Sequence, residues 1–302
     1  MTVTLAIGRE DWQKVLAELI GTFFFLLFGI GAIPAALLTG SADSPAALNT
    51  GFLYIALAHG LALAVAISAL GHISGGHFNP AVTAGMLVAG RITPLLALLY
   101  LLAQLIGGIG SCLAIVYLLP RNVWEQFGLG TPDLAASATG QGIFLEAILT
   151  FFLVLVVFGT AVDRRAAALG GFAIGLAMTL GIMIAGPLGL GLMNPARAFA
   201  PAVVAGLWGS SQLVFWVGPL IGGIAAGLLY NFIFLKDSDG MMSDEELVEA
   251  EMVGGHAANP PLSEPNLVDE SALVHTARAA DMADTIDTSD TADTTAGPEP
   301  RR

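Results

Sequence analysis

The sequence predicts an all-α membrane protein with six transmembrane helices and two re-entrant half-helices, arranged as an inverted repeat. Three observations predict this class. The chain has 302 residues, of which 55% are hydrophobic and 12% are charged, whereas an average soluble domain carries about 25% charged residues. Six long apolar runs follow one another along the chain, and two motifs recur in the same order in each half. A soluble fold of this length could not bury so much apolar surface.

Six apolar runs have the length of a membrane-spanning helix, which needs about 20 mostly apolar residues. The runs cover residues 12–38, 51–70, 94–119, 140–162, 168–186 and 211–235. Glycines recur at four-residue spacing in the last two runs, as Gly171 and Gly175 and as Gly223 and Gly227. This spacing lets helix backbones approach closely in lipid, so we expect helix contacts at these glycines.

Two further apolar stretches, 79–90 and 194–206, are too short to cross a membrane, and each begins with Asn-Pro. Asn is a favoured N-cap, and Pro is favoured at the first helical position. We therefore expect two half-helices that enter the membrane and stop. Broken backbone of this kind is tolerated where it is buried in protein or lines a watery cavity.

The basic residues predict that both termini are cytoplasmic, because Lys and Arg in short loops favour the inner side. If the N-terminus is cytoplasmic, the cytoplasmic segments hold six basic residues and the outer loops hold Arg121. The six are Arg9, Lys14, Arg91, Arg164, Arg165 and Lys236. No separate cleavable apolar segment or targeting signal is visible in the sequence, so we expect the plasma, or inner, membrane.

The charge of the chain divides it into three parts. Residues 1–236 hold equal numbers of acidic and basic residues, so the formal net charge of −13 comes from residues 237–302. That last segment is acidic, rich in Thr and poor in aromatic residues, so we expect a disordered tail, whose partner the sequence does not identify. The expected organisation is a cytoplasmic segment 1–11, a membrane domain 12–236 and the tail 237–302.

An internal repeat relates the two halves of the membrane domain, about 12–119 and 140–235. The segment 17–24 recurs as 145–152, and the segment 77–82 recurs as 192–197. Each half then has three spans with a half-helix between its second and third span. An odd number of spans forces the two copies into opposite orientations, which is the inverted repeat of membrane transport proteins.

Two stretches carry a resemblance to a known family: GHISGGHFNPAVT at 71–83 and GLMNPARAFAPAV at 191–203. They resemble the two signature loops of the aquaporins, or major intrinsic proteins, and the resemblance covers about residues 12–235. It implies an aquaporin-like right-handed helical bundle, a homotetramer with one pore in each subunit, and a passive channel for water.

The doubled motif supplies the candidate pore residues, which are Asn79, Pro80, Ala81, Asn194, Pro195 and Ala196. A capping Asn accepts a hydrogen bond with its side-chain oxygen, which leaves its amide NH2 to donate to a passing water. The positive ends of both half-helices would point at the same place. Together these groups would repel cations and interrupt a proton wire.

The resemblance also implies a selectivity filter of four residues, His59, Ile182, Gly191 and Arg197. Arg197 would supply fixed donors and exclude cations. This set is similar to the filter of plant tonoplast intrinsic proteins that conduct ammonia with water, which adds ammonia to the expected solutes. That subgroup also has a histidine in its third loop, whereas the loop 120–139 has none. Ala198 stands where glycerol-conducting members usually have Asp, which argues against glycerol.

Three titratable groups, two acids within the apolar runs and one histidine beside the first Asn-Pro, each allow two interpretations. Glu18 and Glu146 could form a proton relay, or each could accept hydrogen bonds from the non-helical backbone before a half-helix. We favour the second, structural role because the two acids occupy matching places in the repeat. His77 could gate the pore by protonation or fix its loop by a hydrogen bond, and we favour the hydrogen bond.

Other classes of function fit the sequence less well. It shows no metal-ligand cluster, phosphate loop or nucleophile–base pair, so we expect neither an enzyme nor a cofactor, and no nucleic-acid partner. The expected partners are the lipid bilayer, the other subunits, water and small neutral solutes. A facilitator of glycerol or urea is the first alternative, and an ion-coupled secondary transporter is the second.

Overall fold

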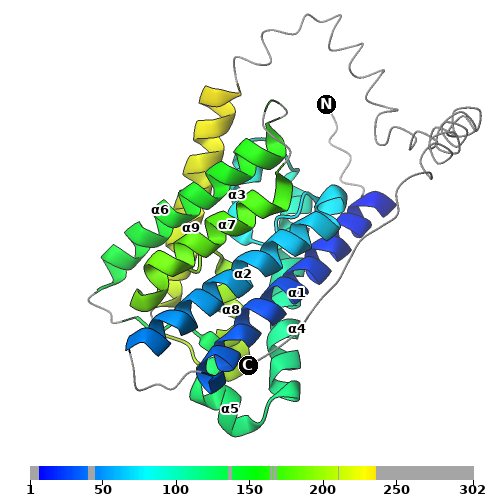
Figure 1. Ribbon diagram of the computed structural model, residues 1–302. Coiled ribbons are helices and arrows are strands. Elements are labelled where there is room, and N and C mark those ends of the chain that lie inside the picture. Colours follow the sequence, from blue (N-terminus) through cyan, green and yellow to red (C-terminus); the bar gives the residue numbers. More distant parts are fainter. Residues whose placement is uncertain are drawn as a thin grey trace, which may run out of the picture. The chain divides into compact units, whose positions relative to one another are not determined.

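The computed structural model describes residues 7–39, 45–134, 138–163, 165, 169–209 and 211–235. Within these residues, six helices are long and apolar enough to cross a membrane, as predicted (Figure 1). They are α1 (Arg9–Thr39), α2 (Pro45–Ser74), α4 (Pro94–Leu118), α6 (Thr139–Val157), α7 (Gly170–Ala185) and α9 (Gln212–Leu229). The predicted tail, 237–302, lies outside the described residues.

Three of these helices continue into a short helix whose turns are tighter or wider than those of an α-helix. The helix α6 continues into the π-helix η3 (Phe158–Val162), and α9 continues into the π-helix η5 (Tyr230–Phe234). The rings of Phe158 and Tyr230 lie 5.7 Å apart, which joins the ends of these two helices. The 3-10 helix η4 (Gly186–Leu188) follows α7 directly.

The two short helices are α3 (Pro80–Val88) and α8 (Pro195–Ala205), as the Asn-Pro stretches predicted. Each begins at the Pro, one residue after its Asn. Asn79 and Asn194 have extended backbones, with φ of −159° and −152°, which is the usual conformation of a capping residue. The prediction of two half-helices is therefore correct.

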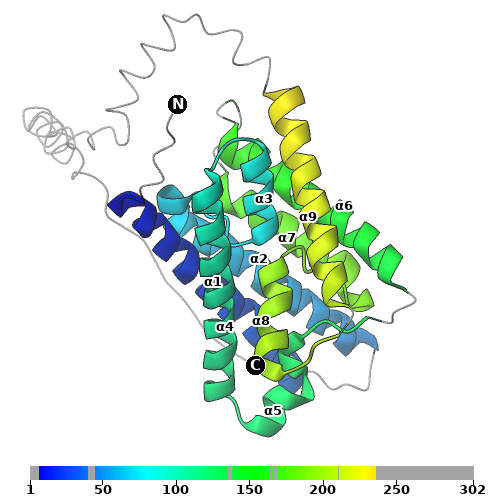
Figure 2. The same cartoon turned by 180° about the vertical axis from the view of Figure 1, so that it is seen from behind.

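The half-helices exchange partners between the two halves of the chain. The helix α3, from the first half, packs against α9 from the second, and α8 packs against α4. Figure 2 shows α8 between α4 and α9. Neither half of the chain therefore surrounds its own half-helix.

Paired glycines in α4 and α9 make these close contacts possible. A Cβ atom on Gly223 would lie against the carbonyl of Ala81 in α3, and one on Gly222 would meet the carbonyl of Ala147 in α6. Gly107 and Gly108 make the matching contacts in the first half, with Leu19 of α1 and with Ala196 and Ala200 of α8. The two glycine pairs are as far apart in sequence as Asn79 and Asn194, so the repeat extends to the packing.

The predicted glycine contacts also occur between α7 and α2. Cβ atoms on Gly171 and Gly175 would meet the carbonyls of Ala64 and Gly60. In α9, a Cβ atom on Gly227 would likewise meet the carbonyl of Gly85. The four-residue spacing of small residues thus marks two helix interfaces, as expected.

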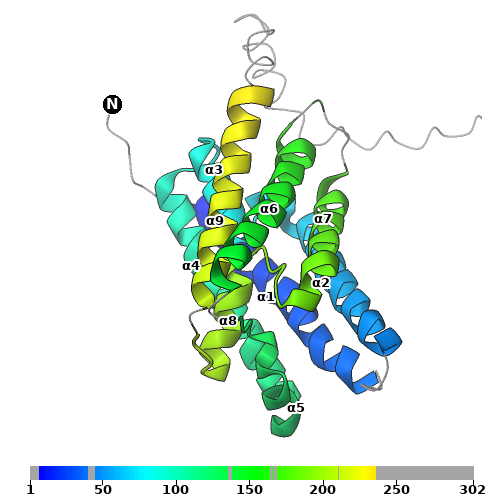
Figure 3. The same cartoon turned by 90° about the vertical axis from the view of Figure 1, so that its left-hand side faces the viewer.

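The third loop is more structured than the sequence indicated. It contains the short helix α5 (Arg121–Gln126), which Figure 3 shows beyond the end of α1, and the single turn η1 (Gly128–Gly130). Leu129 in this turn is buried and packs with the core. The loop therefore belongs to the folded unit.

Replacing Gly223 with Val should destabilise the protein strongly, because the new side chain would meet the backbone of α3. Overpacking a core costs about 1–3 kcal/mol, and a rigid backbone carbonyl cannot move aside as a side chain can. We expect a lower thermal midpoint of the detergent-solubilised protein, measured by fluorescence-detected gel filtration. The matched control is Gly31→Val in α1, because no atom lies within 4 Å of a Cβ there. Equal midpoints for the two variants would contradict the packing argument.

Candidate functional site

Two asparagines form the centre of the site, each at the start of a half-helix. The Asn79 Oδ1 accepts a hydrogen bond of 2.8 Å from the backbone N–H of Ala81. The Asn194 Oδ1 accepts one of 2.9 Å from the backbone N–H of Ala196. Pro80 and Pro195 occupy the first helical positions, where their missing N–H costs nothing.

The amide groups of these asparagines connect the two halves. The Asn79 Nδ2 donates to the carbonyl of Met193 at 2.7 Å, and the Asn194 Nδ2 donates to the carbonyl of Phe78 at 3.0 Å. Phe78 and Met193 have φ of 46° and 51°, which is uncommon for residues other than glycine. An amide NH2 carries two hydrogens, so one N–H of each Asn remains for a ligand. We had expected the whole group to be free.

The cavity between the asparagines is narrow. Asn79 and Asn194 both line a space of about 10 Å³, whose other walls are mainly apolar side chains of α2, α6 and α7. A single water needs about 10–15 Å³ measured in this way. The space therefore suits one water at a time, and among its lining residues the asparagines offer it amide donors.

Glu18 holds the backbone that leads into α3. Its carboxylate is fully buried and accepts hydrogen bonds from the backbone N–H groups of His77 and Phe78, at 2.9 and 2.7 Å. The side chains of Ser74 and Gln104 also donate to it, each at 2.8 Å. These four donors fit the structural interpretation of Glu18. Each carboxylate oxygen already accepts two hydrogen bonds, which argues against a proton relay.

Glu146 has the same position before α8. Its buried carboxylate accepts hydrogen bonds from the backbone N–H groups of Gly191, Leu192 and Met193, the last at 2.8 Å. The two acids therefore make matching contacts with the backbone before each half-helix.

The predicted filter residue His59 has hydrogen-bond partners that fit one tautomer. Its Nδ1 lies 2.9 Å from the carbonyl oxygen of Ile55, and a carbonyl oxygen can only accept, so Nδ1 carries a hydrogen. Arg197 Nε donates to the other ring nitrogen, Nε2, at 3.2 Å. The ring is therefore neutral, with Nε2 as an acceptor.

Arg197 has a second partner in the third loop. Its Nη1 donates to the carbonyl of Gly130 at 2.8 Å. The loop reaches it through three consecutive residues with positive φ, namely Gly128 (51°), Leu129 (54°) and Gly130 (67°). Sequence reasoning missed this contact because it examined the loop only for a histidine. The Gly-Leu-Gly pattern was the available signal, since glycine readily adopts positive φ.

The four predicted filter residues lie together. His59, Ile182, Gly191 and Arg197 all line one cavity of about 220 Å³. Gly191 has a φ of 85°, and a Cβ there would lie 2.8 Å from the carbonyl of Gly181. This position therefore accepts only glycine, which leaves the cavity wider on that side.

His77 forms the loop-fixing hydrogen bond. Its Nδ1 lies 3.1 Å from the Thr83 Oγ1, and its ring packs edge-on against that of Tyr100. Burial lowers the pKa of His77 to about 4. The side chain is then neutral at physiological pH.

Water permeability should not change through His77 between pH 7.5 and pH 5.5. The imidazole stays neutral above pH 4, and its lowered pKa means that protonation destabilises the folded state as the pH falls from 6.5 towards 4. Stopped-flow swelling of proteoliposomes with wild-type protein and with His77→Gln should give the same flat profile. A step near pH 6.5 that disappears in the variant would establish gating.

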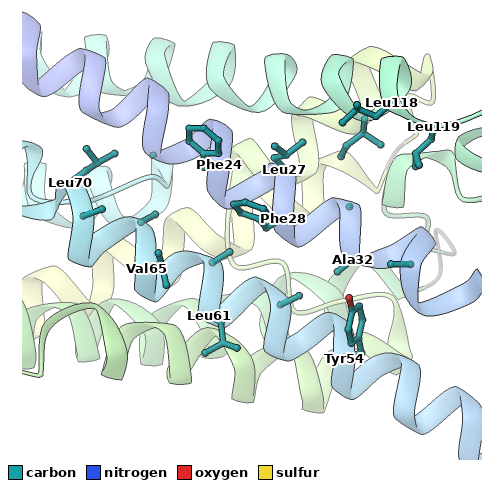
Figure 4. Close-up of a pocket in the computed structure, with 18 residues that line it drawn as sticks. Phe24, Leu27, Phe28, Ala32, Tyr54, Leu61, Val65, Leu70, Leu118 and Leu119 are labelled. Atoms are coloured by element: carbon teal, nitrogen blue, oxygen red, sulfur yellow. The ribbon is translucent and has the colours of Figure 1, made fainter. Parts of the chain in front are cut away.

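Another cavity, of about 760 Å³, lies between α1, α2 and the end of α4 and shares no lining residue with the two cavities above. Figure 4 shows part of its apolar wall, with Phe24 and Phe28 on α1 and Leu61 and Val65 on α2. It contains none of the predicted site residues. Among the residues that the structure describes, no cluster of His, Cys, Asp and Glu could hold a metal ion.

Comparisons with known proteins agree with this geometry. A family model described as Major intrinsic protein matches residues 7–230. The chain is 44% identical over 235 residues to Aquaporin TIP2-1 of Arabidopsis thaliana, covering 75% of this chain and 89% of the relative. It is 42% identical over 228 residues to Aquaporin TIP4-4 of Zea mays, covering 74% and 87%.

A solved structure, the aquaglyceroporin from Plasmodium falciparum, has a similar fold. The TM-score is 0.61 at 21% identity, and the match covers 76% of this chain and 99% of that one. At this identity the likeness concerns the fold alone.

Proposed function

This chain belongs to the major intrinsic protein, or aquaporin, family, whose members are channels and not enzymes, and on that premise we propose that it is a passive water channel. The observation that supports the proposal best is the space of about 10 Å³ shared by Asn79 and Asn194. It suits a single water, and its amide donors come from both halves of the chain.

We assign water selection to these asparagines and to the starts of α3 and α8. A water in the narrow space accepts hydrogen bonds from the remaining N–H of Asn79 and of Asn194, so its own hydrogens point away from both. It then cannot accept a proton from one neighbour and pass it to the next. The positive ends of the two half-helices oppose a cation at the same point.

The outer filter adds a second barrier. Arg197 carries a fixed positive charge, held by the Nε2 of His59 and the carbonyl of Gly130, and a fixed charge excludes cations by repulsion. Ile182 and Gly191 leave room beside it. We propose ammonia as a further solute on the resemblance of these filter residues to those of tonoplast intrinsic proteins.

Stopped-flow measurements on one preparation of proteoliposomes test the proposal. We expect water flux well above that of empty liposomes with a low activation energy, measurable ammonia flux, and little glycerol or urea flux. Water flux equal to that of empty liposomes would refute the channel. Glycerol faster than water would favour a solute facilitator, and uptake that follows a proton or sodium gradient would favour a secondary transporter.

The protein is an integral membrane protein, and we propose its assembly and placement as follows. The subunits form a homotetramer, both termini are cytoplasmic, and residues 12–236 carry the permeability. Native mass spectrometry tests the tetramer, and deletion of 240–302 should leave water flux unchanged. We propose the plasma membrane for the chain. Its relatives are of the tonoplast type, so an internal membrane is the alternative location. A tagged chain found at an internal membrane would overturn the proposed plasma-membrane location.

A further inference from the structure

A cavity of about 640 Å³ opens on the face of the molecule where α1 and α4 begin. Its walls come from the first turns of α1, the segment after α2, the loop after α3 and the first turns of α4. It shares only His77 with the narrow cavity between the asparagines. Its other lining residues do not line that narrow cavity, so the two cavities are distinct and adjoin at His77.

The charged residues of this cavity make it basic. Lys14 and Arg91 line it together with Asp11, whose carboxylate lies 3.6 Å from the Lys14 Nζ. Arg91 donates through Nη2 to the side-chain oxygen of Asn231 at 3.1 Å, which is a neutral partner, and it forms no ion pair with any residue that the structure describes. With His77 neutral, the lining carries one net positive charge.

Much of the remaining wall is apolar, although Ser74, Thr93 and Tyr100 also line it. Ile73, Ile92, Leu95 and Leu96 line the cavity beside the two basic residues. The helix α4 begins here with Thr93 as its cap, so the positive end of a 25-residue helix adds to the field of Lys14 and Arg91. A ligand that fills this space has an anionic part and an apolar part.

We infer that this cavity binds the headgroup phosphate of an anionic phospholipid. Lys14 and Arg91 lie at the ends of membrane-spanning helices or their loops, where a bilayer places its phosphates, and basic pockets between such helices bind lipid headgroups. The apolar walls suit the glycerol backbone and the first methylenes of the acyl chains. Free inorganic phosphate has no apolar part that could contact those walls.

Native mass spectrometry of the full chain tests the inference. The protein is released from nanodiscs of equal parts phosphatidylglycerol and phosphatidylcholine, and the retained lipids are counted. We expect selective retention of phosphatidylglycerol, weakened about fivefold by Lys14→Gln and about fivefold by Arg91→Gln. The matched control is Arg9→Gln, because Arg9 is an exposed residue at the start of the same helix, α1, and does not line the cavity. It should retain the lipid as the wild type does.

Two further arms separate the outcomes. The two charge-preserving single variants, Lys14→Arg and Arg91→Lys, should each retain the lipid as the wild type does. Every variant is first checked for wild-type water flux and a single gel-filtration peak. Equal losses in Arg9→Gln and Lys14→Gln would show a general surface charge effect and overturn the site. Equal retention of phosphatidylcholine, or displacement of the lipid by millimolar inorganic phosphate, would overturn the choice of ligand.

Discussion

Replacing Glu146 with Leu should abolish the folded channel, whereas Glu146→Gln should retain part of it. The carboxylate accepts hydrogen bonds from three consecutive backbone N–H groups that lead into α8. Each buried donor left without a partner costs about 1–3 kcal/mol, and three of them approach the whole stability of a typical domain, about 5–15 kcal/mol. The amide of Gln keeps one acceptor oxygen. The measurement is the yield of monodisperse protein and its thermal midpoint in detergent.

Two comparisons make this result specific to the buried carboxylate. Glu10→Leu removes an exposed acid from the first turn of α1 and should leave yield and midpoint unchanged. The folded fraction of Glu146→Gln should conduct water at the wild-type rate for each channel. A stable Glu146→Leu protein would refute the structural role, and a folded Glu146→Gln protein without transport would support a relay.

Replacing Arg197 with Val should raise glycerol and urea permeability about tenfold, which corresponds to about 1.4 kcal/mol removed from the barrier. The change removes the largest side chain of the filter and its charge. The Nε2 of His59 and the carbonyl of Gly130, which now bind Arg197, line the outer cavity and would bind water instead. Water flux should therefore persist. Stopped-flow assays with each solute measure the change.

The same variant should lose part of its exclusion of cations, because a fixed positive charge leaves the outer constriction. A cation-sensitive dye trapped in the proteoliposomes reports this leak. Arg121→Val is the control, since Arg121 is an exposed residue of α5 paired with Glu125, and it should change neither solute nor cation flux. Unaltered glycerol and urea fluxes in Arg197→Val would show that the filter lies elsewhere.

Much of the fold could be predicted because its signals are properties of side chains. Apolar runs of the length of a span, Asn-Pro at the two helix starts and the glycine spacing of α7 and α9 each depend on residue type. The pairing of Glu18 and Glu146 with the backbone before the half-helices followed from their matching places in the repeat. The repeat therefore carried information that no single motif held.

What the sequence did not predict depends on backbone groups and on distant contacts. Any residue at position 130 has a carbonyl, so nothing in residue type marks Gly130 as the partner of Arg197. The carbonyls of Phe78 and Met193 that accept from the asparagines are hidden in the same way. Gln104 was missed because it reaches Glu18 across 86 residues. Contacts of this kind appear only once the helices are placed.

The exchange of half-helices between α4 and α9 imposes an order of assembly during synthesis. A nascent chain makes α3 long before it makes α9, the helix against which α3 rests. The re-entrant segment therefore leaves the ribosome without its main neighbour, and a chain arrested before Gln212 offers it only the smaller contacts with α4, α6 and α8. Insertion of the last span therefore completes the surroundings of α3 and, with them, the bundle.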